Sequence, residues 1–244
     1  MTSRAILETR KRPQVLVINI ESPDECLVKM TGIDYNNESS VYFNRGYGVS
    51  EKKFKGIKEF KFPMPLTPDK LLFTTSCGDI LSVRSEPIKR GELFLRDDDA
   101  DFLKMALSFA ENAAYLPAGA YEKNCFLIMY NDEIINHATG KSESTPARIS
   151  RTTGIIEINR KQFIEFSIPM RVVILLHEYM HFRLNTRIEI EADFNALNVF
   201  LKYGFTKTEA LYAFTKIFYD KQRKDLEERV QRIYDFIAEF PEIN

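Results

Sequence analysis

The pattern of apolar residues changes near residue 96 of this 244-residue chain. Up to that point, short runs rich in Val, Ile, Tyr, Phe and Thr are separated by Gly, Pro, Asn and Asp, which is typical of β-strands and turns. Beyond it, apolar residues recur at helical spacing. We therefore predict an α+β protein, with a β-rich module at residues 1–96 that could dock onto a partner, followed by an α-rich domain at residues 97–244.

Individual strands and helices can be placed within these two parts. The acidic residues 97–101 open a helix, because carboxylates near a helix N-terminus complement its dipole. Another helix is expected at residues 170–184, which are apolar on almost every side of the helical wheel and should be buried. The predicted strands are residues 14–20, 25–31, 41–44, 71–76, 80–84, 92–95, 124–130 and 154–159.

Composition and charge are those of an ordinary globular protein. The chain is 44% hydrophobic and 28% charged, with a formal net charge of −1, which excludes a disordered, fibrous or membrane protein. Residues 1–13 contain no apolar segment typical of a targeting signal, and the longest aliphatic run, residues 172–176, is too short to cross a bilayer. We therefore expect a protein that is cytoplasmic when synthesised and has no membrane partner.

The three cysteines give no sign of a shared site. Cys26, Cys77 and Cys125 are widely spaced and include no CxxC pair. A disulfide framework has an even number of cysteines, and a thiolate zinc site has closely spaced pairs. We expect all three to be reduced and partly buried.

Lysines and phenylalanines are interleaved in residues 52–62. Such a segment could track a phosphate backbone with its lysines while its aromatic rings stack on bases. The alternative is an edge strand that its lysines keep soluble. Because the excess of positive charge in residues 1–96 is small, we favour the edge strand and do not expect a nucleic-acid partner.

Residues 177–181 read His-Glu-Tyr-Met-His, which is the HExxH spacing. Side chains four residues apart on a helix share a face, so both imidazoles can reach one metal ion while Glu178 points to one side. Buried polar groups without partners would each cost about 1–3 kcal/mol. The apolar surroundings in residues 170–184 therefore favour a metal site at His177 and His181.

The next helix supplies acidic residues to the same region. Thr186 and Glu189 have the spacing of a capping box, which starts a helix that runs to Tyr203 and stops at Gly204. On the wheel of this helix, Glu189 and Asp193 fall on the inward side. Two inward acids on a helix that folds back along the HExxH helix could complete a metal site.

The roles of these two acids are open. One carboxylate could be the third metal ligand while the other orients a histidine through a hydrogen bond. Within a capping box, however, Glu189 could simply bond the backbone of Thr186. Only seven residues separate His181 from Glu189, and this short connection leaves Asp193, one turn deeper, as an alternative ligand.

Residues 97–220 resemble the gluzincin metallopeptidases. The active-site helix of that family matches residues 174–181, Ile-Leu-Leu-His-Glu-Tyr-Met-His, and its ExxAD element matches residues 189–193, Glu-Ile-Glu-Ala-Asp. The resemblance implies a zincin-like domain that cleaves a peptide or protein substrate. It also implies that residues 154–159 form the sheet edge at which an extended peptide binds.

The same resemblance implies a role for each site residue. His177, His181 and Glu189 would bind Zn2+, and Glu178 would be the general base that activates a zinc-bound water. Asp193 would orient one of the ligands. The expected reaction is zinc-dependent hydrolysis of a peptide bond.

A second resemblance concerns residues 189–214, which are similar to zincin-like proteins encoded among the virion and tail genes of phages that infect gut Bacteroides. It implies a structural virion protein, located in a tail or a portal-proximal ring, in which the zincin fold serves assembly. Other virion subunits in a homo-oligomeric ring would then be its partners. The apolar stripe of residues 226–240 is expected to pack on the domain.

Overall fold

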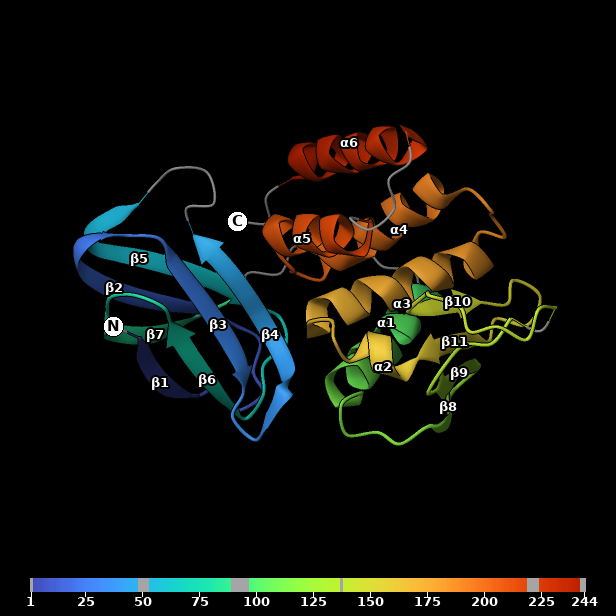
Figure 1. The fold of residues 1–244 in the computed structure, drawn as a ribbon, viewed down its shortest axis with the longest axis horizontal. Coiled ribbons are helices and arrows are strands. Elements are labelled where there is room, and N and C mark those ends of the chain that lie inside the picture. Colours follow the sequence, from blue (N-terminus) through green and yellow to red (C-terminus); the bar gives the residue numbers. More distant parts are fainter. Residues whose placement is uncertain (1, 48–52, 89–96, 137, 219–223, 242–244) are drawn as a thin grey trace. The chain divides into compact units, whose positions relative to one another are not determined.

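The computed structural model describes the chain except for residues 1, 48–52, 89–96, 137, 219–223 and 242–244. The chain divides into two compact units, Met1–Arg90 and Gly91–Asn244. The described part of the first unit contains strands without helices, whereas the second combines a sheet with helices (Figure 1). The predicted α+β class and the β-rich to α-rich order are confirmed, and the units divide a few residues before the predicted position.

The strands of the first unit form two antiparallel sheets. One sheet has the order β1-β6-β3-β4 and the other the order β5-β2-β7. Every neighbouring pair in both sheets is antiparallel. The strands are β1 (Ser3–Glu8), β2 (Gln14–Cys26), β3 (Val28–Asp34), β4 (Asn37–Tyr47), β5 (Phe54–Met64), β6 (Lys70–Thr75) and β7 (Asp79–Pro87).

Alternating side chains of these strands fill the core of the first unit. In β2, the buried residues Leu16 and Ile18 pair with Phe62 and Phe60 of β5. The Phe62 ring stacks on Phe43 of β4, with the ring centroids 4.6 Å apart. Aromatic side chains of the two sheets therefore meet in a common interior, as in a β-sandwich.

The segment that interleaves lysines and phenylalanines forms β5, which lies at the edge of its sheet as predicted. Its aromatic residues Phe54, Phe60 and Phe62 are buried, whereas Lys53 and Lys55 are exposed. The buried rings cannot stack on bases. The strand β1 was not predicted, and the predictions for residue 52 and residues 92–95 lie outside the described part of the chain.

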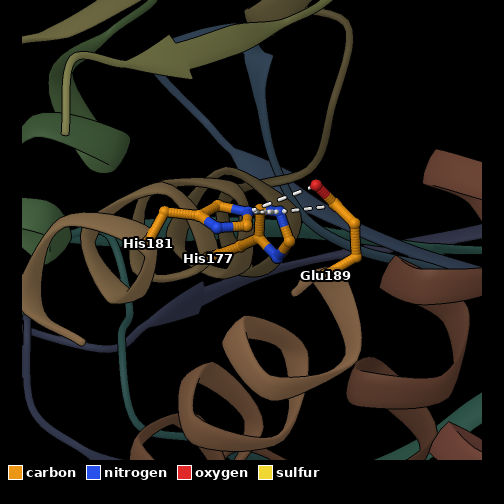
Figure 2. Close-up of side chains that lie close together, drawn as sticks. All are labelled: His177, His181 and Glu189. Carbon is orange, nitrogen blue, oxygen red and sulfur yellow. Dashed lines mark hydrogen bonds and ion pairs between the residues drawn. The ribbon is translucent and has the colours of Figure 1, made fainter. Parts of the chain in front are cut away.

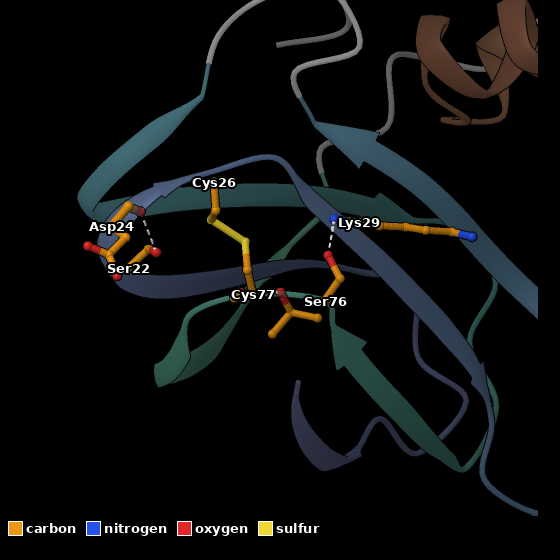
Figure 3. The surroundings of a disulfide bond; sticks show 7 residues. Ser22, Asp24, Cys26, Lys29, Ser76 and Cys77 are labelled. Carbon is orange, nitrogen blue, oxygen red and sulfur yellow. Dashed lines mark hydrogen bonds between the residues drawn. A yellow bond between two sulfur atoms is a disulfide. The ribbon is translucent and has the colours of Figure 1, made fainter. Parts of the chain in front are cut away.

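Cys26 and Cys77 form a disulfide bond (Figure 3), so the prediction that they are reduced is wrong. Cys125 is free and exposed rather than partly buried. The pairing of β3 with β6 explains the bond, because Ser76 donates its backbone N–H to the carbonyl oxygen of Lys29 at 2.9 Å and thereby brings the two cysteines together. They are 51 residues apart in the sequence, so their spacing could not reveal this pairing.

The second unit combines a sheet of order β10-β11-β9-β8 with six helices in its described part. The strands β11 and β9 are parallel, and the other neighbours are antiparallel. The elements are α1 (Asp97–Asn112), β8 (Gly119–Lys123), β9 (Phe126–Asn131), β10 (Ala147–Ile149), β11 (Ile156–Asn159), α2 (Arg160–Phe163), α3 (Ile168–Arg183), α4 (Glu189–Lys202), α5 (Lys207–Phe218) and α6 (Lys224–Glu239).

The strand predicted at residues 154–159 is β11, but it does not lie at the edge of the sheet. It pairs with β9 on one side and with β10 on the other, so the prediction that it binds an extended peptide at a free edge is wrong. The edge strand on this side is β10. With only three residues, β10 is too short to show a strand pattern in the sequence.

Helix α3 is the central helix of the second unit and packs against α1, α4, α5, β10 and β11. Every residue from 168 to 176 is buried, as the apolar pattern predicted, but Phe182, near the end of the predicted buried helix, is exposed. The fully buried guanidinium of Arg171 donates hydrogen bonds to the backbone carbonyl oxygens of Phe163, Ala110 and Ile164. These bonds tie the start of α3 to α1 and α2, and they satisfy the buried charge.

Helix α6 packs on α4 through the apolar stripe, as predicted. Ile233 and Ile237 are buried, and the Phe236 ring stacks on Phe194 of α4 with the centroids 4.9 Å apart. The side chain of Leu226 lies outside the described part. None of the helices in the described ranges is both long enough and apolar enough to span a membrane.

Candidate metal centre

Side chains from two consecutive helices converge in the second unit (Figure 2). His177 and His181 extend from one face of α3, and Glu189 is the first residue of α4. The connection between the helices is tight. Asn185 has a left-handed backbone conformation (φ 48°), and Thr186 donates its backbone N–H to the carbonyl oxygen of His181 at 3.1 Å. This turn reverses the chain and brings Glu189 back beside the histidines.

The predicted capping box of Thr186 and Glu189 is wrong. Helix α4 begins later, with Ile188 as its N-cap and no side-chain cap. The Thr186 hydroxyl accepts the backbone N–H of Ile188 at 3.1 Å and donates to the Glu191 carboxylate at 2.5 Å. Because Glu191 binds the threonine, the carboxylate of Glu189 faces the histidines instead.

The donor atoms have the spacing of metal ligands. The Nε2 atoms of His177 and His181 are 3.1 Å apart. Oε2 of Glu189 lies 3.5 Å from Nε2 of His177, and Oε1 lies 3.5 Å from Nε2 of His181. A tetrahedral zinc ion with bonds of about 2.0–2.1 Å would hold its ligand atoms about 3.3 Å apart. The His177, His181 and Glu189 group can therefore hold a metal ion.

The second ring nitrogen of each histidine lies close to an oxygen atom. Nδ1 of His181 lies 3.0 Å from the carbonyl oxygen of Thr186, to which its N–H can donate. Nδ1 of His177 lies 2.8 Å from Oδ1 of Asp193. With protons on both Nδ1 atoms, each Nε2 directs its lone pair at the shared centre. Two lone pairs that face each other at this distance need a cation or a proton between them.

Asp193 is fully buried one turn after Glu189. It faces Nδ1 of His177, the ring nitrogen that points away from the shared centre. Both of its oxygens also accept hydrogen bonds from Arg229, at 2.6 Å from Nε and 2.9 Å from Nη2. This arrangement favours Glu189 over Asp193 as the third ligand and leaves Asp193 to orient His177.

The sequence reasoning did not identify Arg229, which α6 brings to the site from 36 residues beyond Asp193. Its Nη1 also lies 3.1 Å from Oε2 of Glu189, and only 14% of its side chain is exposed. Arg229 stands four residues before the buried Ile233, in line with the apolar stripe of α6. A cation in such a stripe indicates a buried anionic partner, although the sequence could not show which one.

The charges of this cluster shift the pKa values of its members. Burial lowers the pKa of His177, but its contacts with Asp193 and Glu189 outweigh burial and raise the pKa to about 10. The hydrogen bond with His177 lowers the pKa of Glu189 to about 2, against the effect of partial burial. In the metal-free protein, His177 therefore carries a proton that a metal ion would have to displace.

Glu178 lies beside the histidines, at the edge of the sheet. Burial raises the pKa of its carboxyl group, and the nearby imidazoles partly oppose this shift. The backbone of Ile149 in β10 has a smaller effect, which also lowers this pKa.

No protein-family model matches the chain, and no curated protein matches it either. What the site can do chemically is therefore inferred from its own geometry.

Proposed function

We propose that residues 97–244 form a gluzincin-like zinc metallopeptidase domain, which hydrolyses peptide bonds in a peptide or protein substrate. The observation that carries this proposal is the convergence of His177, His181 and Glu189, with Glu178 adjacent on α3. Two imidazoles and one carboxylate are a donor set of catalytic zinc sites, which keep a further position open. A purely structural site would normally be closed by a fourth protein ligand.

In this proposal, His177, His181 and Glu189 hold the zinc ion. Bound zinc would supply Lewis-acid chemistry, because it polarises a carbonyl group and lowers the pKa of water. The contact of Asp193 with Nδ1 of His177 at 2.8 Å keeps the proton on that nitrogen, so that Nε2 stays available as a ligand. The carbonyl oxygen of Thr186 does the same for His181.

Glu178 is the proposed general base. Its carboxylate takes a proton from the attacking water and passes it to the nitrogen of the leaving amine. Burial raises its pKa, which brings the group closer to the pH at which a general base works best.

The substitution Glu178→Gln tests this role, because it removes the proton acceptor and keeps the size of the side chain. We expect cleavage of a peptide library to fall about 10²–10⁴-fold, while zinc content and folding stay unchanged. Glu122→Gln, at an exposed position of β8, is the matched control and should cleave like the original protein. An unchanged cleavage rate in Glu178→Gln would contradict the proposal.

A second candidate function is assembly, which exposed apolar side chains of the first unit favour. Ile6, Leu27, Ile57 and Leu81 are 49–64% exposed, and a partner subunit that covers such side chains removes their apolar area from water. The alternative proposal is a structural virion protein whose β-rich unit contacts other virion subunits in a homo-oligomeric ring. Mass photometry tests it. A ring of defined mass would support assembly, and a monomer at all concentrations would contradict it.

A further inference from the structure

Arg229 of α6 bridges two carboxylates of the candidate metal centre. It binds both oxygens of Asp193, at 2.6 and 2.9 Å, and its Nη1 lies 3.1 Å from Oε2 of Glu189. One guanidinium group therefore contacts both the carboxylate that faces His177 and the carboxylate of the third proposed ligand. A planar guanidinium with several fixed donors is suited to hold two carboxylates in one geometry.

The two carboxylates depend on Arg229 for different reasons. The Asp193 side chain is 0% exposed, so its charge would be buried with a weaker set of partners if the guanidinium were removed. The Glu189 side chain is 53% exposed, and a mobile glutamate loses conformational entropy when it is fixed as a ligand. By holding Glu189 beforehand, Arg229 reduces that loss.

The position of Arg229 depends on the docking of α6. The helix is held on the unit by the buried side chains of Ile233 and Ile237 and by the stack of Phe236 on Phe194. Arg229 lies one turn before Ile233 on the same side of the helix. It can reach the carboxylates only while these apolar contacts keep α6 in place.

We propose that α6 completes the metal centre, with Arg229 as a positioning residue, so that binding of a divalent cation and docking of α6 stabilise each other. This inference rests on the proposed zinc site. The formal charges agree with it, because Glu178, Glu189 and Asp193 carry three negative charges, which Arg229 and one divalent cation balance. Such coupling is reciprocal, so zinc must stabilise the docked helix by the same free energy by which the docked helix strengthens zinc binding.

Zinc affinity, measured by competition with a chromophoric chelator, is the first test. Arg229→Met removes the charge and keeps most of the side-chain volume, and we expect it to weaken zinc binding about tenfold or more. Arg229→Lys keeps the charge but lacks the planar guanidinium. Its zinc affinity should lie between those of the original protein and Arg229→Met. The matched controls are Arg232→Met and Arg232→Lys, on the same helix, where the guanidinium lies 5.7 Å from the centre of the Phe194 ring. They should bind zinc like the original protein.

Hydrogen exchange of the backbone amides in residues 230–239 is the second test, and it does not depend on activity. Zinc should slow the exchange of these amides in the original protein and in the Arg232 variants. In Arg229→Met, zinc should slow their exchange much less. A merely structural role of Arg229 would change the exchange equally with and without zinc. That result would overturn the coupling.

A double-mutant cycle with Asp193→Asn shows whether Arg229 acts through its carboxylate partners. We expect Arg229→Met to weaken zinc binding less in the Asp193→Asn background, because part of the interaction is already gone. If the original protein binds zinc and Arg229→Met and Arg229→Lys bind it equally well, the inference is wrong and the zinc site stands. If the original protein binds no zinc, both the proposed function and the inference fail.

Discussion

The two units differ in the polar side chains that they bury. In the described part of the first unit, the buried polar residues carry hydroxyl groups and are Thr9, Ser22, Ser40, Thr67 and Thr75. In the second unit, they include the ionisable residues Asp99, Arg171, His181, Asp193 and Glu209. Burying an ionisable group is costly unless it is paired. The described interior of the first unit therefore needs no charged partners, whereas that of the second contains ionisable groups that do.

Two groups of buried charge in the second unit contrast with each other. Arg171 donates hydrogen bonds to backbone carbonyl oxygens of Phe163, Ala110 and Ile164. Asp193 and His181 instead lie in one network with Glu189, whose carboxylate is half exposed. A buried charge that ends on backbone carbonyls stabilises the fold. A buried network of ionisable groups that reaches solvent through a possible metal ligand, here Glu189, is a candidate functional site.

Loss of the disulfide should have the largest effect, and it should be confined to the first unit. The bond joins residues 51 apart, and for a loop of this length the chain-entropy model gives about 4 kcal/mol. We expect the Cys26→Ser, Cys77→Ser double variant to lose about this much free energy of unfolding in urea. Zinc content should not change. A loss of zinc in this variant would show that the zinc site of the second unit depends on the disulfide of the first.

Arg171→Met should destabilise the second unit by about 3 kcal/mol, because buried carbonyl oxygens lose their donor. Zinc affinity of the folded fraction should stay unchanged, since these carbonyl oxygens belong to α1 and to the end of α2 rather than to the candidate ligands. The control Lys104→Met, at an exposed position of α1, should change the free energy of unfolding by less than about 0.5 kcal/mol. Weaker zinc binding in Arg171→Met would show that the two groups of buried charge are not separable.

Asp193→Asn should lower zinc affinity about 10–100-fold, because the amide holds Nδ1 of His177 less strongly. The competition assay with a chelator measures this change. Asp235→Asn, at an exposed position of α6, is the matched control and should bind zinc normally. If Asp193→Asn bound zinc as tightly as the original protein, the buried carboxylate would have only a structural role.

The effect of pH on the stability of the metal-free fold should be smaller than the effects of these substitutions, but its sign is definite. The pKa of His177 is raised to about 10, so its proton stabilises the metal-free fold fully below about pH 6.5 and loses this effect as the pH rises toward 10. The pKa of Glu189 is lowered to about 2, so its contribution holds above about pH 4.5 and is lost as the pH falls toward 2.

Zinc must displace the proton of His177. At pH 8, calorimetry in buffers of different ionisation enthalpy should therefore detect release of about one proton per zinc bound. Zinc binding without proton release would mean that His177 is already neutral in the metal-free protein. It would also mean that the contacts with Asp193 and Glu189 do not hold a proton there.

Local patterns were enough to predict part of the site. His177 and His181 share a helix face because they are four residues apart, and the apolar residues around them correctly predicted a buried helix. The sequence also placed Glu189 and Asp193 near these histidines, because the connection between α3 and α4 is short. It could not assign their roles, because the start of α4 depends on Thr186 binding Glu191 instead of Glu189.

Features that depend on distant parts of the chain were missed. The disulfide follows from the pairing of β3 with β6, and Arg229 reaches Asp193 only because α6 packs on α4. Neither pairing leaves a periodic signal in the sequence. The edge position of β10 was missed because a strand of three residues carries no periodic signal.

Metal content of the purified protein is the most direct test of the central claim that His177, His181 and Glu189 form a zinc site. Elemental mass spectrometry should find about one zinc per chain in the original protein. His181→Ala should lose it, and Glu178→Gln should keep it. Folded original protein that takes up no zinc, even when zinc is added, would contradict the claim.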